Sequence, residues 1–482
     1  MLLSVMVMGT GAASFTDQDE FSDNYAEAAE VLTGMGIIQG YDDGSFLPQR
    51  NINRAQVATM IYRAATGDVT DSKISQFVGE DLFDDVNADD WFAGYVNYCG
   101  NAEYIKGFTP DTFGPYKQVT GYQVLAMILR AVGYDENDEY TGDQWTLRVA
   151  ATAREQGLLD NLNPDTNLAE PATRELVAQL IFEAIQIDTV RYSPAAGAYR
   201  PSTTPASSLG EQVFDLAVVN DNDVWGRPAT IWYAESSTYW NGAVKNDGYQ
   251  SDKDDLYATI EEEALATYTT AVKICDVADD LGIAEETFTT YTNGEVNDGT
   301  VKIDADATTA TIGAQGRLTE VYEDTIVYID TFLAEVTGVT EVKYDADGHV
   351  AKDASLTLLV YANDAGQEIV LKDDTNYTYA EGDMLLVNAV TDGAGWHDAI
   401  ATDGDKHVEF IGAAESFVGA QTYIRWNDNQ HTVGGDVYND ALHFHLDAAG
   451  QDRTENFNWW LDQYGNLIGV TAIDRTNYAV LK

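Results

Sequence analysis

The chain has 482 residues, 45% of them hydrophobic, so it is too apolar to be disordered as a whole and long enough for about three domains. Its 80 Asp and Glu residues against 26 Lys and Arg residues give a formal net charge of -54 at pH 7. This charge argues against nucleic acid and bare anionic membranes as partners, and it suits an exported protein in a cation-rich setting.

Residues 1–14 form a short apolar stretch that ends in the small residues Ala12, Ala13 and Ser14. This pattern is typical of the hydrophobic region and cleavage site of a secretory signal peptide, so we predict a secreted chain that begins near Ser14 or Phe15. No later segment approaches the roughly 20 consecutive apolar residues that a membrane-spanning helix needs, so we expect no membrane span.

Residues 36–56 carry a helix-loop-helix pattern. Apolar residues spaced as on one helical face precede Gly36, where glycine lets the first helix end in left-handed backbone. Asp42-Asp43-Gly44 is a turn signal, and Asn53 is a predicted N-cap with Gln56 as its capping-box partner. A second helix is therefore expected to begin directly after Asn53.

The helix-loop-helix pattern occurs three times. Aligning the ends of the second helices places Arg54, Gly121 and Arg174 at the same position without a gap. Three copies of a unit of roughly 50 residues predict helical hairpins that share one core. We therefore expect an all-α N-terminal bundle whose three repeats lie at residues 15–68, 80–135 and 140–190.

These repeats resemble S-layer homology domains. The family pattern has an aromatic-Asp start, a Trp-Ala pair, a Gly-Ile-x-x-Gly-Tyr-x-Asp-Gly-Thr-Phe-x-Pro loop, and Ile-Thr-Arg-Ala-Glu at the second helix. The second repeat departs from it by having Gly121 in place of the Arg, and the third repeat has lost the Gly-Tyr-x-Asp-Gly loop. The matching residues are Phe21-Ser22-Asp23, Gly36–Pro48 and Asn53-Arg54-Ala55-Gln56 in the first repeat, Phe83, Asp84 and Trp91 in the second, and Thr173-Arg174 in the third.

The resemblance implies a pseudo-threefold bundle that binds an anionic secondary cell-wall polysaccharide, often capped by a pyruvyl ketal, and so anchors an exported protein to a Gram-positive-type wall. An Arg fork near a helix N-terminus suits a carboxylate-bearing sugar, because unpaired backbone N–H groups also face the ligand there. Lys117 is a candidate substitute for the Arg missing at Gly121. If Lys117 does not take this role, we expect the second repeat not to bind the polysaccharide. The glycan-binding candidates are Gly40, Tyr41, Asn53, Arg54, Gln56, Trp91, Lys117, Thr120, Thr173 and Arg174.

Two alternatives stay open for these candidates. Each Arg could simply pair with a neighbouring acid on the surface, as most exposed ion pairs do with little effect. Aromatic residues such as Tyr41 and Trp91 could belong to the core of the bundle instead of contacting sugar.

The second half of the chain reads as β-structure. A Pro-, Ser- and Thr-rich stretch at residues 191–209 predicts a linker. Short alternating runs with Asn-Gly and Asp-Gly turns then predict mainly antiparallel β modules at residues 210–345 and 346–482, with one helical insertion at Ala264–Leu281. The predicted strands are Val213–Val219, Thr230–Tyr233, Thr325–Ile329, Thr357–Tyr361, Met384–Val390 and Leu467–Thr471.

The β-rich half offers few candidate sites. His443 and His445 share one strand face, a spacing that can supply two metal ligands, although ordinary strand residues are the alternative. Asp345-Ala346-Asp347-Gly348 lacks the later ligands of a calcium loop and fits a hairpin turn, which leaves diffuse calcium binding by the acidic surface open.

The sequence contains no serine-hydrolase elbow, zinc-protease helix or phosphate-binding loop, so we predict that the protein is not an enzyme. We expect the β-rich half to face outward for assembly into a surface lattice or for adhesion. The alternatives are a wall-anchored enzyme that acts on polysaccharides and a calcium-dependent adhesin that forms no lattice.

Overall fold

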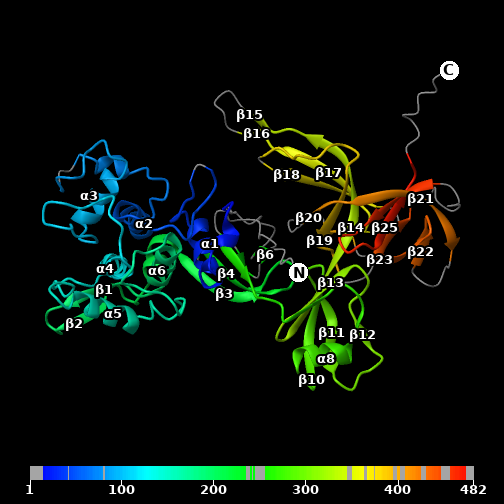
Figure 1. The fold of residues 1–482 in the computed structure, drawn as a ribbon, viewed down its shortest axis with the longest axis horizontal. Coiled ribbons are helices and arrows are strands. Elements are labelled where there is room, and N and C mark those ends of the chain that lie inside the picture. Colours follow the sequence, from blue (N-terminus) through cyan, green and yellow to red (C-terminus); the bar gives the residue numbers. More distant parts are fainter. Residues whose placement is uncertain are drawn as a thin grey trace. The chain divides into compact units, whose positions relative to one another are not determined.

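The computed structural model describes residues 15–41, 43–79, 82–234, 239–240, 243–244, 256–344, 350–362, 366–373, 375–393, 399–401, 408–424, 430–446 and 456–473. The predicted signal peptide at residues 1–14 lies outside these ranges. The chain divides into two compact units (Figure 1). The first unit contains the residues up to Val219 and parts of two later strands, and the second contains the remaining residues. The prediction of a multidomain chain with helices first and β-sheets later is confirmed.

The helices of the first unit begin where the sequence places N-caps. The Asn53 side chain accepts a hydrogen bond from the Gln56 backbone N–H, and the Gln56 side chain accepts one from the Asn53 backbone N–H, which confirms the predicted capping box. Thr120 and Thr173 cap later helices through their side-chain oxygens. The α-helices are α1 (Ala26–Gly34), α2 (Arg54–Thr66), α3 (Ala93–Asn101), α4 (Gly121–Ala131), α5 (Trp145–Glu155), α6 (Arg174–Gln186) and α7 (Leu209–Phe214), and the short 3-10 helices are Gln18–Glu20, Asp23–Tyr25 and Ile74–Gln76.

The helices of the first unit pack around one core (Figure 1). Helices α2, α4 and α6 contact one another. The outer helices contact them in a cyclic order, with α3 on α2, α5 on α4 and α1 on α6. The buried side chains of this core include Leu32 of α1, Phe92, which directly precedes α3, and Val149 of α5. Each outer helix therefore packs on the central helix of a different helical pair.

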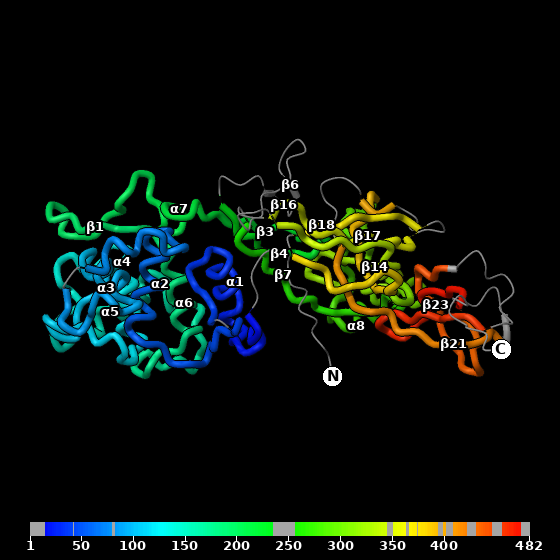
Figure 2. The backbone as a smooth tube through the Cα atoms, turned by 90° about the horizontal axis from the view of Figure 1, so that it is seen from above, coloured from blue at the N-terminus to red at the C-terminus, as the bar shows by residue number. Residues whose placement is uncertain are grey.

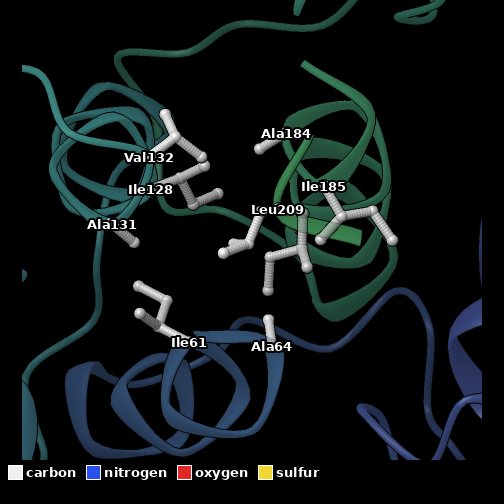
Figure 3. Close-up of a pocket in the computed structure, with 9 residues that line it drawn as sticks. Ile61, Ala64, Ile128, Ala131, Val132, Ala184, Ile185 and Leu209 are labelled. Atoms are coloured by element: carbon white, nitrogen blue, oxygen red, sulfur yellow. The ribbon is translucent and has the colours of Figure 1, made fainter. Parts of the chain in front are cut away.

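A small apolar cavity lies between the C-terminal parts of α2, α4 and α6. Figure 3 shows Leu209, the first residue of α7, among side chains from all three helices, including Ile61, Ile128 and Ile185. The cavity volume is ≈ 10 Å³. Because its lining is apolar and it has barely room for one water molecule, we expect the cavity to contain no water. Leu209 thus completes a core that the three helical pairs do not fill by themselves.

We predict that Leu209→Ala lowers the free energy of unfolding of the first unit by about 2–4 kcal/mol, because the substitution removes buried apolar atoms and enlarges an apolar cavity. Calorimetric unfolding of the full chain measures the change. Leu147→Ala is the matched control, because the Leu147 side chain is 66% exposed on α5 and should have almost no effect. Equal stability of the Leu209 variant and the wild type would show that α7 is dispensable for the bundle.

The segment predicted as a linker contains ordered structure. Strands β1 (Val190–Ser193) and β2 (Ala198–Pro201) form an antiparallel hairpin, and α7 follows. The ring of Tyr199 packs 4.9 Å from that of Tyr134, measured between centroids, and its hydroxyl donates to Glu139. Figure 2 shows the hairpin and α7 along one side of the helices. Composition alone did not reveal these contacts, because Tyr134 and Glu139, the partners of Tyr199, lie outside the Pro-rich stretch.

A three-stranded sheet follows, made of β3 (Leu216–Asn222), β4 (Pro228–Ala234) and β7 (Leu256–Glu261). Trp232 of β4 belongs to the core of the first unit, where its ring packs on Phe182 and its indole N–H donates to Glu27. The predicted strands at Val213–Val219 and Thr230–Tyr233 are confirmed, although α7 takes up the start of the first. Two short strands, β5 (Tyr239–Trp240) and β6 (Ala243–Val244), pair with each other.

The second unit begins with a sheet in the order β11-β10-β14-β13-β8. Helix α8 (Ile274–Leu281) is only the second half of the helix predicted at Ala264–Leu281. Its expected first half forms strands instead, because Thr267 and Tyr268 pair with β13 and β-branched and aromatic residues favour extended backbone. The strands are β8 (Ala266–Tyr268), β9 (Val272–Lys273), β10 (Glu285–Thr292), β11 (Glu295–Asp304), β12 (Thr311–Ile312), β13 (Arg317–Val321) and β14 (Thr325–Thr340).

Strand β14 is shared by two sheet regions. Its first half pairs with β10 and β13, and its second half pairs with β17 and β19, which lie beyond the boundary that we predicted between residues 345 and 346. The sequence marks no break in β14, which is buried over most of its length. The further strands are β15 (Lys343–Tyr344), β16 (Val350–Lys352), β17 (Ala354–Val360), β18 (Gln367–Asp373), β19 (Met384–Ala389) and β20 (Val408–Ala413).

The last strands close into a small barrel in the order β21-β22-β23-β25-β24. Trp459 lies in its core with no exposed surface. Strands β23 and β25 are parallel, as are β10 and β14, whereas the other neighbours in the β14 sheet and in the barrel pair antiparallel. The barrel strands are β21 (Glu415–Ile424), β22 (Gln430–Val433), β23 (Asp436–Leu446), β24 (Asn456–Leu461) and β25 (Leu467–Thr471).

Candidate functional site

The N-termini of α2 and α6 do not present free backbone amides. Arg54 N–H and Ala55 N–H donate to the carbonyls of Lys117 and Pro115, each over 3.0 Å. At the start of α6, the amides of Arg174 and Glu175 donate in the same way to the carbonyls of Arg50 and Pro48. The expectation that unpaired amides would face a ligand is therefore wrong at these positions, because the loop of another repeat supplies their acceptors.

The guanidinium of Arg54 links two repeats. Its Nε donates to the Phe113 carbonyl at 2.9 Å and its Nη2 to the Lys106 carbonyl at 2.7 Å, and its Cζ lies 4.6 Å from the centre of the Phe113 ring. The residue is 4% exposed. These bonds use two of the five guanidinium N–H groups, and within the described part of the chain no acceptor is found for the others.

Arg174 repeats this geometry at a second junction. Its Nε donates to the Phe46 carbonyl at 2.7 Å and its Nη2 to the Gln39 carbonyl at 3.2 Å. Its Cζ lies 4.3 Å from the centre of the Phe46 ring and 4.9 Å from that of Tyr41. We call these two places the Arg54 junction and the Arg174 junction. Both candidate arginines thus hold neighbouring repeats together, whatever else they bind.

An exposed cation accompanies the buried arginine at each junction. Arg50 lies over the ring of Tyr41 at 5.8 Å, and Lys117 lies over the ring of Phe108 at 3.5 Å. Lys117 therefore belongs to the Arg54 junction and does not replace the Arg missing at Gly121. Sequence reasoning overlooked Arg50, although its spacing of four residues before Arg54 matches that of Lys117 before Gly121.

Both buried guanidinium groups would be stabilised by an anion placed beside them. Burial, together with nearby Arg130, lowers the pKa of Arg54 to about 10. Burial also lowers the pKa of Arg174, and Arg50 adds to this effect while Tyr41 opposes it. Both guanidinium groups stay protonated at neutral pH, but they are poorly solvated and lie near like charge. A carboxylate placed beside either one would relieve that cost.

The N-terminus of α4, which begins with Gly121 in place of an Arg, forms a third junction with the loop before α6. Gly121 faces the loop before α6, and a Cβ at this position would lie 2.6 Å from the Leu168 side chain. The amide of Tyr122 donates to the Leu168 carbonyl. At the position of Arg50 the third repeat has Glu170. Gly121, which stands where α2 and α6 have Arg, therefore lies directly against Leu168 of the loop before α6.

The other candidates have mainly structural roles. Asn53, Thr120 and Thr173 are the helix caps described above. Gln56 donates to the Tyr41 hydroxyl at 3.3 Å, which links α2 to the Arg174 junction. Gly40 is packed so closely that an added Cβ would lie 2.9 Å from the Ser45 carbonyl oxygen.

The first repeat begins earlier than the family pattern suggested. Asp17 accepts hydrogen bonds from the amides of Phe46 and Leu47, as Asp85 does from those of Phe113 and Gly114. Phe15-Thr16-Asp17 is therefore the equivalent of Phe83-Asp84-Asp85, and the assignment of Phe21-Ser22-Asp23 is wrong. The sequence is ambiguous here because Phe-x-Asp occurs twice, and Phe21 also packs on Phe46.

His443 and His445, the predicted pair of metal ligands, each contact another side chain. The His443 ring lies 2.9 Å from buried Asp330, and the ring of His445 stacks on that of Tyr361 with centroids 3.9 Å apart. Within the described ranges no group of His, Cys, Asp and Glu could hold a metal ion. His349, His397, His407 and the Asp345–Gly348 turn lie outside those ranges.

Among the helices that the structure describes, none has the length and apolar character needed to cross a membrane.

Comparison with known proteins identifies a domain family in the part of the chain that contains the Arg54 junction. The pattern of the S-layer homology domain matches residues 14–58 and 82–124, and the first match begins just before Phe15. The chain is 28% identical over 188 residues to the middle cell wall protein of Brevibacillus brevis. This match covers 39% of this chain and 17% of that protein. It is 34% identical over 135 residues to the surface layer protein of Brevibacillus choshinensis, covering 28% and 12%.

A third relative is an amylopullulanase of Thermoanaerobacterium thermosulfurigenes, 26% identical over 183 residues, which covers 35% of this chain and 9% of the enzyme. The chain therefore spans less than one fifth of the length of each of these three relatives.

Proposed function

We propose that this protein, which carries S-layer homology domains at residues 14–58 and 82–124, is a secreted surface protein that its N-terminal unit anchors to a bacterial cell wall without a covalent bond. The observation that carries the proposal is the pair of equivalent junctions, each with a buried guanidinium, an aromatic ring and an exposed cation. In a chain of net charge -54, such a local focus of positive charge is what an anionic polymer requires.

The ligand we propose is an anionic secondary cell-wall polysaccharide with a pyruvyl ketal as its acid group. Arg54 and Arg174 supply charged N–H donors with fixed direction, because two bonds to backbone carbonyls hold each guanidinium in place. Lys117 and Arg50 are exposed and supply a mobile second charge. The third junction, which has Gly121 and Glu170, is proposed to be silent.

The proposed bundle has three repeats related by pseudo-threefold symmetry, with the third at residues 140–190. The cyclic contacts of α1, α3 and α5 with α6, α2 and α4 support this arrangement. So does the cyclic use of loop carbonyls, in which the second repeat accepts from α2, the third from α4 and the first from α6. The hairpin β1–β2 and Leu209 of α7 are proposed to complete the anchor.

We propose that the β-rich remainder faces outward and serves lattice assembly or adhesion, with calcium bound diffusely by its acidic surface. No catalytic activity is proposed, because two of the relatives are wall or surface proteins by name and the shared part is 9% of the amylopullulanase. Hydrolysis of wall or host polysaccharide by the full chain would favour the enzyme alternative. A chain that binds walls but forms no ordered sheets with calcium would favour the adhesin.

The experiment that tests the anchor compares binding of the full chain to cell walls before and after acid extraction of the secondary polymer. We predict that Arg50→Gln combined with Lys117→Gln weakens binding to intact walls by at least about tenfold, because each junction loses a charged contact to the polymer. The melting temperature should not change, since both side chains are exposed.

The matched control for this pair is Arg191→Gln combined with Arg200→Gln, which removes the same charge from exposed positions on the β1–β2 hairpin. Equal loss of binding in both double variants would mean that net charge alone governs binding. Binding that does not depend on the polymer in the wild type would refute the proposed ligand.

A further inference from the structure

The two arginine junctions have the same backbone contacts but different surroundings. Equivalent positions can be read from the shared hydrogen bonds, in which Pro48 and Arg50 at one junction correspond to Pro115 and Lys117 at the other. By this alignment Tyr116 takes the place of Gln49, Ala55 the place of Glu175, and Trp91 the place of Asn24. The two junctions therefore differ in the side chains that a bound polysaccharide would contact.

The Arg174 junction contains a buried carboxylate. Glu175 is 4% exposed, and its oxygens accept hydrogen bonds from the amide and hydroxyl of Ser22 and from the side chain of Gln49, each at 2.9 Å. This negative charge is adjacent in sequence to Arg174 and opposes the approach of an acidic sugar. The polar side chains around it are already satisfied by one another.

At the Arg54 junction Ala55 stands at the position of Glu175, and aromatic rings are exposed there instead. Tyr116 lies between Pro115 and Lys117, whose carbonyls accept from the first amides of α2, and it is 69% exposed. Trp91 is 55% exposed. Both rings pack edge-on against fully buried Phe92, each with centroids 5.4 Å apart, so the packing of Phe92 fixes their positions.

This combination suits a charged sugar better than it suits either an apolar or a purely ionic partner. The C–H faces of a pyranose pack against exposed aromatic rings, and the Tyr hydroxyl and Trp N–H can bond sugar hydroxyls. Lys117, held 3.5 Å from the Phe108 ring, and Arg54 supply positive charge for a carboxylate at the same junction.

We infer that Trp91 and Tyr116 form a stacking platform for a sugar ring of the anionic polysaccharide, and that the Arg54 junction therefore binds this polymer more tightly than the Arg174 junction. The inference rests on the proposed anchoring function. It assigns the two junctions different strengths, with stacking and charge at the Arg54 junction and charge alone at the Arg174 junction.

The test exchanges residues between the junctions in the full chain. Trp91→Asn and Tyr116→Gln give the Arg54 junction the residues that the Arg174 junction has at the same positions. Binding to polymer-bearing cell walls should fall about tenfold for each variant, which corresponds to about 1.4 kcal/mol of binding free energy. Leu147→Asn, which alters a side chain that is 66% exposed on α5, is the control and should bind like the wild type.

A second readout separates ligand contact from structure. Addition of polymer-bearing wall fragments should shift the tryptophan fluorescence of the wild type to shorter wavelength, and Trp91→Asn should remove this shift while the melting temperature stays the same. Polymer-dependent binding that neither variant weakens would overturn the platform but leave the anchor intact. Absence of polymer dependence in the wild type would instead overturn the anchor. Reduced self-association of both variants without a change in wall binding would mean that the rings contact a second copy of the chain, which also overturns the platform.

Discussion

Replacing Arg54 by alanine is expected to destabilise the N-terminal unit by about 2–4 kcal/mol, because it leaves two buried carbonyl acceptors without donors. These acceptors, on Phe113 and Lys106, belong to the loop of the next repeat, so the loss falls on the contact between repeats. Arg174→Ala should act in the same way through Phe46 and Gln39. Loss of wall binding in either variant would then report on folding as well as on ligand contact.

The measurement is denaturant unfolding of the full chain, followed by the helical circular dichroism signal that the first unit dominates. Arg54→Lys separates the two roles of the side chain, because it keeps the charge but cannot form both carbonyl bonds with fixed direction. Arg191→Ala, on the exposed β1–β2 hairpin, is the control. Unchanged stability of Arg54→Ala together with lost wall binding would make Arg54 a ligand residue with no role in holding the repeats together.

The second large effect is expected at Asp330 of β14. Its carboxylate is 2% exposed and accepts two hydrogen bonds from Arg317, at 2.6 and 2.9 Å, and one from His443 of the barrel at 2.9 Å. Asp330→Ala should lower the stability of the second unit by about 3–5 kcal/mol, because it leaves the partly buried Arg317 charge without its buried partner. Calorimetry of the full chain would show a lower unfolding temperature.

The same group predicts a pH dependence. Burial alone would raise the pKa of Asp330, but the hydrogen bonds from His443 and Arg317 outweigh it and hold this pKa well below its usual range. A group whose pKa is depressed on folding stabilises the protein above its unfolded pKa, which is about 3.9, and this contribution is lost as the pH falls further. The stability gap between the wild type and Asp330→Ala should therefore be constant at neutral pH and narrow below pH about 4. A gap that is the same at every pH would mean that Asp330 acts by shape alone.

The sequence predicted the helical part of the fold well where local interactions decide it. The capping box of Asn53 and Gln56 and the helix starts at Arg54, Gly121 and Arg174 lie where they were predicted. The turn at Asn293-Gly294 joins β10 and β11, with positive φ at both residues. Such features depend on residues a few positions apart, so a single sequence carries the information.

Prediction failed where distant residues compete for the same segment. The helix expected at Ala264–Leu281 lost its first half to pairing with β13, and the linker at residues 191–209 became a hairpin. The aromatic-Asp motif of the first repeat was assigned to Phe21-Ser22-Asp23, because only the contact of Asp17 with the amides after Ser45 distinguishes the two Phe-x-Asp motifs. A pattern of neighbouring residues carries no information about contacts between residues that are far apart in the sequence.

The sequence by itself determined that this chain has repeated helix-loop-helix units, a β-rich remainder and a strongly acidic surface with few cations. The tertiary structure decided what those cations do: it buries Arg54 and Arg174 against carbonyls of another repeat, and places Lys117 and Arg50 beside them. It also decided that Leu168 closes the junction at Gly121. The physical reason is that a buried arginine donates to the carbonyl groups that folding brings close to it. Here these acceptors lie about 50 residues or more away along the chain.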